Sequence, residues 1–298
     1  KCFFGKYELL ERLAVGGMGE IYLAKQGSKT GIVRHVIVKT LLPENRDSEK
    51  FVQQFLDEAR IAATLNHPNV VGLIEVGEHE GTIFIAMEYI RGRNLAQISS
   101  LALETRLDIS HVVWAKIVHG AACGLHHAHE IKSDDGLSLG LVHRDISPQN
   151  IMIRSDGVTK ILDFGIALIS DKTFKTSTGI LKGKLSYISP EQIANQKASP
   201  LSDQFSLGVI FWELICEEPL RSPRTDTFTL LQEAVQRDVP SVLAAKPRAD
   251  VDLARIVAKM TRRKAEERYG SCQELADDLQ AFLQKNDYVS QVEISEAL

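Results

Sequence analysis

The hydrophobic and polar positions change period several times along the chain. Between Tyr7 and Thr40, glycines bracket runs rich in β-branched and aromatic residues, which predicts strands joined by tight turns. From Ser48 the period becomes helical and ends at Asn66-His67-Pro68. The apolar positions on one face of this predicted helix are Phe51, Phe55, Ala59 and Ala62. Two further strand-like runs follow, "VVGLIEVGE" and "GTIFIAMEYI", separated by the turn signal "HEGT".

Beyond "RGRN" the pattern is mainly helical. The segment 111–130 is one long amphipathic helix by its spacing, and 207–216 is apolar enough for a buried helix. "IMIRSDGVTKIL" interrupts the helices as a compact hairpin with Asp156-Gly157 at its turn. Helical patterns run from Pro190 to about Leu283. The sequence therefore predicts an α+β protein with a small antiparallel β-sheet lobe and one main helix at 1–90, a larger and mostly helical lobe at 91–283, and a tail or linker at 284–298.

Composition and charge narrow the class of protein. The 298 residues contain 44% hydrophobic and 25% charged residues, which is ordinary for a globular protein. With a net charge of −4, the chain lacks the overall positive charge that attracts nucleic acid, so nucleic acid is not indicated as its main partner. Four scattered cysteines, without a C-x-x-C pair, favour reduced thiols in the cytoplasm over disulfides or a zinc site. No apolar run has the length of a membrane span. Because the chain begins at Lys1, we expect a piece of a longer protein, and a signal or membrane anchor could lie outside this piece.

Three glycines in "LAVGGMGEIYLAK" stand between two predicted strands. Gly16, Gly17 and Gly19 allow a tight bend whose exposed N–H groups can hold phosphate. A plain hairpin turn explains them equally well, because short glycine motifs are frequent.

Lys39 ends the apolar run "VIVK", and Glu58 lies on the following predicted helix. An ion pair between them would hold the lysine ready for an anion. The alternative is a lysine at a solvent-facing strand end and an exposed helical glutamate, as most glutamates are.

The stretch "HRDISPQN", residues 143–150, concentrates polar side chains directly after the apolar "LGLV". Asp163 in "ILDFG" follows at the far end of the predicted hairpin. Asn150 and Asp163 would thus come from the two ends of one hairpin, which suits two oxygen ligands for a hard cation such as Mg²⁺. Turn chemistry without a ligand is the alternative for Asp163.

The order of these features carries more information than any one of them. A glycine-rich hairpin, a strand lysine, a helix glutamate, H-R-D-x-x-x-x-N, D-F-G and "SPE" appear in one direction along the chain. From Phe4 to Leu283 the chain resembles the protein kinase superfamily. "GGMGEIYLAK", "LNHPNVV" and "YISPEQ" look most like bacterial eukaryotic-like serine/threonine kinases. The resemblance implies the bilobal protein kinase fold.

The resemblance also implies a role for each matching residue. Lys39 would contact the α- and β-phosphates of ATP and pair with Glu58, Asp145 would orient or deprotonate the substrate hydroxyl, and Asn150 and Asp163 would hold Mg²⁺, or Mn²⁺ in its place. Asp203 would anchor the catalytic loop, and Glu191 would form a buried pair with Arg268. The residues that the resemblance places around ATP are Leu13, Ala14, Val15, Gly16, Gly17, Gly19, Ile21, Ile37, Lys39, Met87, Glu88, Ile90 and Met152, of which Glu88 and Ile90 would act through their backbones.

An activation segment between Asp163 and Glu191 would carry regulation. In the family, an arginine such as Arg144 receives a phosphate on that segment. The candidate phosphosites are Thr173, Thr176, Ser177 and Thr178, with Thr176 and Thr178 preferred. An unmodified polar loop is the alternative.

Several positions depart from the family pattern. Ala14 replaces the first glycine of the loop, and Ile37 replaces the alanine against adenine. Ser147 stands where the family has the lysine that steadies the γ-phosphate, and Lys184 stands where it has a threonine. Our hypothesis is that Lys184 supplies the charge that Ser147 lacks, since the charge at the site matters more than the segment it comes from. A solvated Lys184 and a slower enzyme are the alternative.

The sequence therefore predicts an ATP- and Mg²⁺-dependent serine/threonine protein kinase, regulated by autophosphorylation of its activation segment. A pseudokinase or nucleotide-sensing scaffold is the alternative, although all five central polar residues are present. The partners expected are ATP and a protein substrate that carries serine or threonine. A homodimer, in which one copy phosphorylates the other, is a further possible partner. We expect a cytoplasmic location, or the cytosolic part of a membrane-anchored protein.

Overall fold

The computed structural model describes residues 2–16, 19–27, 31, 33–133, 135–164, 185–194, 196–221 and 225–286. The chain divides into two compact units, with the first break between Arg91 and Gly92. Each unit is described by itself.

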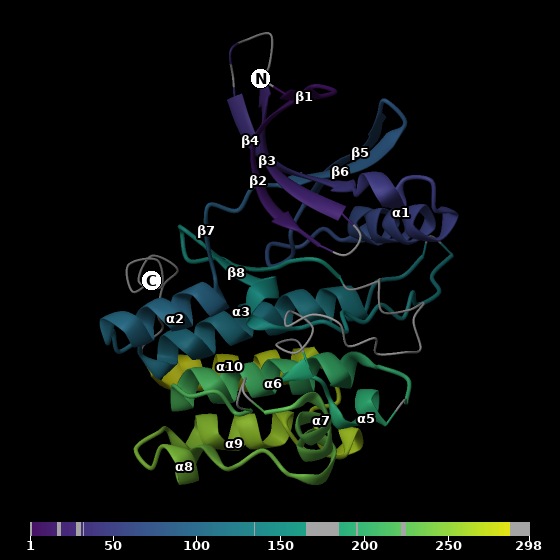
Figure 1. Cartoon of the computed structure of the whole chain (residues 1–298). Coiled ribbons are helices and arrows are strands. Elements are labelled where there is room, and N and C mark those ends of the chain that lie inside the picture. The colour runs from purple at the N-terminus through teal and green to yellow at the C-terminus, as the bar shows by residue number, and fades with distance from the viewer. Residues whose placement is uncertain are drawn as a thin grey trace. The chain divides into compact units, whose positions relative to one another are not determined.

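The first unit is a six-stranded antiparallel sheet in the order β1-β2-β3-β4-β6-β5, with one long helix (Figure 1). The strands are β1 (Cys2–Phe4), β2 (Tyr7–Val15), β3 (Gly19–Gly27), β4 (Val33–Leu41), β5 (Leu73–His79) and β6 (Thr82–Glu88), and the helix is α1 (Glu49–Thr64). The strand and helix runs predicted from the sequence are all present. Strand β1 was not predicted, because its three residues are too few to show a period.

The two faces of this sheet have separate cores. Val36 and Val38 of β4 pack with Tyr7 and Phe84 in one cluster, whereas Leu41 packs with Phe55, Ala59, Ile85 and Met87 in another. Alternate side chains of a strand point to opposite faces. Lys39 therefore shares a face with Leu41, which packs against α1.

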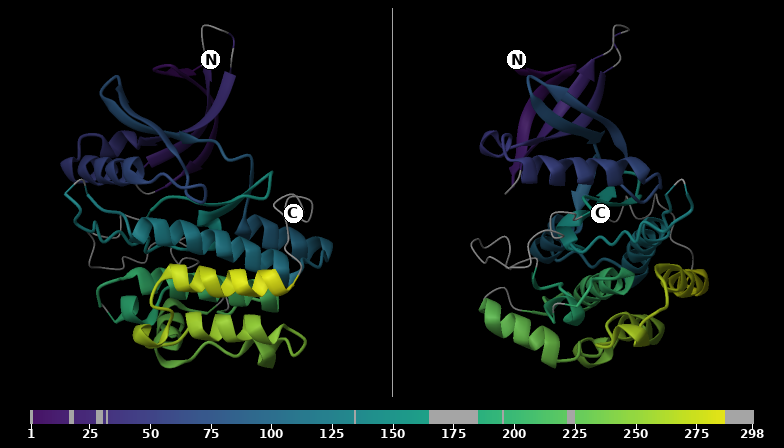
Figure 2. Two further views of the ribbon diagram at one scale, coloured as in Figure 1. Left: turned by 180° about the vertical axis from the view of Figure 1, so that it is seen from behind. Right: turned by 90° about the vertical axis from the view of Figure 1, so that its right-hand side faces the viewer.

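The second unit is mostly helical and holds a three-stranded sheet in the order β7-β8-β9. Its elements are β7 (Gly92–Asn94), α2 (Leu95–Thr105), α3 (His111–His129), β8 (Ile151–Arg154), β9 (Thr159–Ile161), α5 (Pro190–Ile193), α6 (Pro200–Cys216), α7 (Thr227–Gln236), α8 (Val242–Ala245), α9 (Val251–Met260) and α10 (Cys272–Lys285). Three short 3₁₀ turns complete the description, at Pro43–Asn45, Pro148–Asn150 and Ala265–Glu267. Figure 2 shows α10, in yellow, running alongside α3, with which it is in extensive contact.

Helix α6 lies at the centre of this unit. It begins with a capping box at Ser199 and Ser202, and most of its residues are buried, including the polar Asp203 and Gln204. A helix that is apolar nearly all round must be covered on all sides. The apolar run at 207–216 is thus a buried helix, as predicted, although the helix begins earlier, at Pro200.

Strand β7 occupies the stretch "RGRN", which the sequence had indicated only as the break between lobes. Gly92 pairs with Arg154 of β8, and a β-carbon at this position would collide with the carbonyl of Ile153. The strand therefore depends on a close backbone approach that only glycine permits. No helix in the described ranges has the length and apolarity needed to cross a bilayer.

Candidate active site

The turn between β2 and β3 contains the glycine motif. The Gly16 N–H donates to the Gly19 carbonyl at 2.8 Å, and Gly19 lies so close to the Thr40 carbonyl of β4 that a side chain would not fit. Leu13 and Val15 are exposed, and Ala14 pairs with Ile21 across the two strands. Gly17 lies outside the described residues.

Lys39 and Glu58 form an ion pair between β4 and α1. Their side chains are only 13% and 12% exposed. The alternative of a solvent-facing lysine and an exposed glutamate is therefore wrong. Two charges held out of water need one another, because a buried charge without a partner is strongly disfavoured.

The end of β6 carries the residues expected at adenine. Met87 is buried and pairs with Ile37 of β4. The backbone N–H of Glu88 donates to the Gly72 carbonyl at 2.9 Å, so this N–H is already used within the fold. Ile90, two residues further, is buried at 5% exposure.

In the second unit, Asp203 holds the loop that contains "HRD". Its Oδ2 accepts from the His143 N–H and its Oδ1 from the Arg144 N–H, both at 2.8 Å. His129 Nε2 lies 2.8 Å from the same Oδ2. Arg144 has a φ of 66°, in the left-handed region that costs a residue with a β-carbon about 1–2 kcal/mol. The buried carboxylate fixes both N–H groups of this strained turn and so sets the direction of the next residue, Asp145.

Asp145 and Asn150 are joined directly. The Asn150 amide Nδ2 donates to the Asp145 carbonyl at 2.8 Å and to its carboxylate Oδ2 at 3.1 Å. Because both bonds use the amide nitrogen, the amide oxygen is left for another partner. The loop thus presents a carboxylate and an amide oxygen in a fixed relation.

Asp163 follows β9 with a φ of 36°, another strained backbone position. The preceding Leu162 donates its N–H to the Asn150 carbonyl at 2.9 Å and accepts from His143 Nε2 at 2.8 Å. The following Phe164 packs on the His143 ring, with centroids 4.7 Å apart. These contacts bring the two ends of the hairpin together. That Asn150 and Asp163 share one cation stays a prediction. Met152 lies on β8 of this hairpin and is partly buried.

Ser147 is 1% exposed, and its hydroxyl has no hydrogen-bond partner among the described residues. An unsatisfied buried hydroxyl costs about 1–3 kcal/mol. Lys184, the residue expected to compensate for it, lies outside the described residues, as do Thr173, Thr176, Ser177 and Thr178.

Glu191 and Arg268 form a bidentate pair, with N–O distances of 2.7 and 2.9 Å. Arg268 is 4% exposed and also donates to the Leu201 carbonyl. Burial by itself would raise the pKa of Glu191, but the Arg268 guanidinium outweighs it and the pKa is lowered. The pair joins the start of α5 to the turn before α10.

Some supporting residues were missed from the sequence. His129 contacts Asp203, but the sequence could not single it out, because the last turn of α3 contains three histidines. Gln192 reaches the Arg144 carbonyl at 3.4 Å, and its capping box with Ser189 was readable from the spacing S-x-x-Q. Tyr187 donates to Glu213 at 2.9 Å across 26 residues, a contact that no local pattern predicts.

These two units have the architecture of protein kinases. A protein kinase domain model matches residues 7–279. The kinase domain of Mycobacterium tuberculosis PknI, a solved structure, matches 94% of this chain and 96% of its own with a TM-score of 0.67 and 25% identity. The chain belongs to the protein kinase family, and within it to the bacterial eukaryotic-like kinases, so the predicted fold and family are confirmed.

Two curated relatives cover almost the whole chain. "Tyrosine-protein kinase MasK" of Myxococcus xanthus is 37% identical over 283 residues, which is 95% of this chain and 44% of the relative. "Probable serine/threonine-protein kinase PknB" of Lactococcus lactis is 29% identical over 94% of this chain and 42% of the relative. The chain thus spans less than half the length of these relatives. The chain is a protein kinase domain, and the names of these two relatives differ in the acceptor residue, tyrosine for one and serine or threonine for the other.

Proposed function

We propose that this kinase domain transfers the γ-phosphoryl group of ATP to serine or threonine of a protein. The observation that carries the proposal is the bonded pair of Asp145 and Asn150 on a loop held by Asp203. The serine/threonine relatives and the motifs "LNHPNVV" and "YISPEQ" support the acceptor class. The name of the Myxococcus relative makes tyrosine the competing acceptor.

In the proposed mechanism, Asp145 accepts a hydrogen bond from the substrate hydroxyl and takes its proton as the phosphorus–oxygen bond forms. Lys39, held by Glu58, contacts the α- and β-phosphates, and the N–H groups of the glycine turn contact the phosphate oxygens. The leaving group is ADP. Placement and neutralisation of charge account for most of the rate in such a transfer.

Asn150 and Asp163 suit a hard divalent cation. One amide oxygen and one carboxylate are the ligands that Mg²⁺ takes from proteins, with phosphate oxygens and water completing the shell. The use of the Asn150 nitrogen by Asp145 leaves the amide oxygen as its donor to a metal. A bound Mg²⁺ would neutralise charge on the phosphates, and Mn²⁺ would serve the same ligands.

Phosphorylation of a generic protein with γ-labelled ATP tests the proposal. We expect label on the protein in the presence of Mg²⁺ or Mn²⁺ and none after chelation with EDTA. After acid hydrolysis, the label should migrate with phosphoserine or phosphothreonine. Label on phosphotyrosine alone would reject the proposed acceptor, and absence of transfer with either metal would support the scaffold alternative.

We further propose that Lys184 provides the cation that Ser147 replaces. The unpaired, buried hydroxyl of Ser147 supports this, because an ammonium group would supply the donor that it lacks. Lys184→Ala should lower kcat by about 10-fold or more, as for removal of a group that stabilises the transferring phosphoryl. The double change Ser147→Lys with Lys184→Thr should restore activity. Turnover of Lys184→Ala near that of the unaltered chain would contradict this role.

For regulation, we propose that a phosphate at Thr176 or Thr178 binds Arg144. The guanidinium Nε of Arg144 has no partner among the described residues, which supports the proposal. Autophosphorylation in trans would require a transient homodimer. We propose a cytoplasmic location, or the cytosolic side of a membrane-anchored protein.

A further inference from the structure

The peptide group that joins Arg144 to Asp145 is held from outside the catalytic loop. Its carbonyl accepts a hydrogen bond from Gln192 Nε2 at 3.4 Å, from a residue 48 positions further along the chain. Its N–H, which belongs to Asp145, donates to His143 Nδ1 at 3.3 Å. Because a peptide group is planar, contacts at its oxygen and at its nitrogen together fix its rotation. The direction in which the Asp145 side chain leaves the backbone therefore depends on Gln192.

This peptide group follows a strained residue. Arg144 has a φ of 66°, in the left-handed region, and its own N–H is held by Asp203 Oδ1 at 2.8 Å. A backbone in such a region persists only where the surrounding structure restrains it. Asp203 restrains Arg144 on its N-terminal side, and Gln192 restrains it on its C-terminal side. Loss of the second restraint should let the peptide group before Asp145 rotate while the first part of the turn stays in place.

Neighbouring contacts fix the orientation of the Gln192 amide. Its Oε1 accepts from the Ser189 N–H at 3.2 Å and from the Ser189 hydroxyl at 2.9 Å. The amide oxygen therefore faces Ser189, and the amide nitrogen is the end that faces the Arg144 carbonyl. An amide supplies an acceptor at one end and a donor at the other, whereas glutamate keeps only the acceptor and lysine only the donor. The two contacts can thus be removed one at a time.

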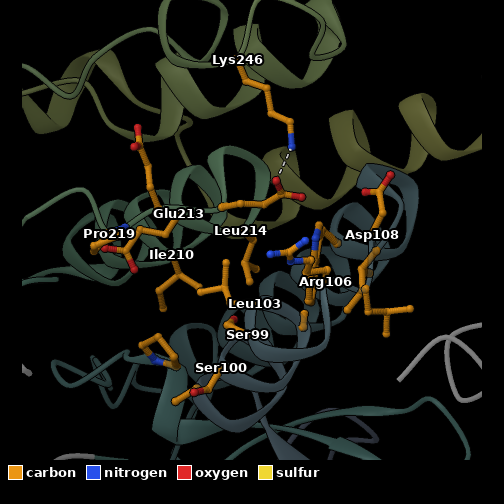
Figure 3. Close-up of a pocket in the computed structure, with 18 of the residues that line it drawn as sticks. Ser99, Ser100, Leu103, Arg106, Asp108, Ile210, Glu213, Leu214, Pro219 and Lys246 are labelled. Carbon is orange, nitrogen blue, oxygen red and sulfur yellow. Dashed lines mark ion pairs between the residues drawn. The ribbon is translucent and has the colours of Figure 1, made fainter.

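The short helix α5, which carries Gln192, is itself fixed to the rest of the second unit. The preceding residue, Glu191, pairs with the buried Arg268 through two hydrogen bonds. Before the helix, Tyr187 donates to Glu213 of α6 at 2.9 Å. Figure 3 shows Glu213 towards one end of a pocket that Tyr187 also lines. A group that orients another must itself be held in place, and these contacts meet that condition for Gln192.

We propose that Gln192 is a positioning residue for phosphoryl transfer: it holds the peptide group before Asp145 and so aims that carboxylate at the substrate hydroxyl. This inference rests on the proposed function and adds to it a residue that acts through Asp145, without contact to ATP or to the protein substrate. A displacement of about 1 Å at the reacting groups can cost about 100-fold in rate. A contact of 3.4 Å restrains less than a short one, so its removal should cost about 10-fold.

Two substitutions at Gln192 separate this role from that of a helix cap. Gln192→Glu keeps the acceptor for Ser189 but turns a carboxylate towards the Arg144 carbonyl, so kcat should fall by about 10-fold. Gln192→Lys loses the acceptor, but its ammonium group can donate to that carbonyl, so kcat should stay within about threefold of that of the unaltered chain. KM for ATP should be the same in all three proteins.

A residue that served only to cap α5 would give the opposite order of kcat, because glutamate is as suitable as glutamine in a capping box and lysine is not. A kcat of Gln192→Glu equal to or above that of Gln192→Lys would therefore overturn the proposal.

A neutral substitution and a second capping box serve as controls. Gln192→Met removes the donor and the acceptor without adding a charge, and it should lower kcat as much as Gln192→Glu does. Gln97 has the same position in the capping box of α2, where its Oε1 accepts from the Asn94 N–H at 3.0 Å, and its side chain is exposed. Gln97→Glu should leave kcat unchanged within error. Full activity of Gln192→Met, or an equal loss in Gln97→Glu, would count against the positioning role.

Hydrogen–deuterium exchange of the segment 143–150 measures the loop without turnover. Its amides should exchange about 10-fold faster in Gln192→Met than in the unaltered chain and in Gln97→Glu, while α6 exchanges at one rate in all three. Unchanged exchange of 143–150, or faster exchange throughout the chain, would overturn the proposal. If the chain transfers no phosphate, the proposed function fails, yet faster exchange confined to 143–150 would still uphold Gln192 as the residue that holds the loop.

Discussion

Asp145→Asn is expected to lower kcat for phosphoryl transfer by about 10²–10⁴-fold, the range for loss of a positioned general base. The amide cannot take the proton of the substrate hydroxyl. It can still accept from Asn150 Nδ2, so the loop should keep its geometry. ATP binding, measured by the quenching of a fluorescent analogue, should be unaltered, because the change removes no phosphate contact.

Asp135→Asn is the matched control for this change. Asp135 is an exposed carboxylate in the hairpin that precedes the catalytic loop, and its loss should leave activity within error. Single-turnover measurements at saturating ATP compare the three proteins directly. If Asp145→Asn retained a tenth or more of the activity, Asp145 would not be the proton acceptor.

Arg268→Met is expected to destabilise the second unit by about 3–5 kcal/mol, the cost of leaving one charge of a buried pair without its partner. Glu191 would keep the Ser202 hydroxyl at 2.8 Å but lose the guanidinium, and the carbonyls of Leu201, Arg262 and Arg263 would lose a donor. Methionine preserves most of the apolar volume, so the loss reports the pair and its hydrogen bonds. A lower midpoint of urea unfolding, followed by circular dichroism, measures the effect.

Arg263→Met provides the comparison for Arg268. Arg263 pairs with Asp238 at 2.9 Å, but the two side chains are 45% and 76% exposed, so its loss should cost no more than about 1 kcal/mol. Because the pKa of Glu191 is lowered in the fold, the stability from the buried pair is present above about pH 5 and is lost as the pH falls through the lowered pKa. The difference between Arg268→Met and the unaltered chain should therefore shrink in acid. Equal destabilisation by both variants at neutral pH would contradict the structural role of the buried pair.

The sequence alone was sufficient for the elements with a strong period. The alternation in β4, the helical spacing of α1 and the turn Asp156-Gly157 are local properties, and each element forms where its pattern predicts. Strands β1 and β7 could not be predicted, because three residues show no period and their pairing depends on strands elsewhere. The motif order predicted the family, since those residue types are separated by spacings that chance does not assemble.

What the sequence by itself determined is which side chains are available for chemistry: the strand lysine, the helix glutamate, the loop aspartate and asparagine, and the aspartate after the hairpin. Only the tertiary structure decided how they are held. Lys39 is buried against Glu58 because β4 turns that face towards α1, and Asp145 is aimed by Asp203, which lies 58 positions further along the chain, on α6. The segment before α5 is likewise held by hydrogen bonds between Tyr187 and Glu213 and between Arg221 and Ser186. Such contacts join residues far apart in the chain, and their energy comes from burial, which no local pattern of residues can express.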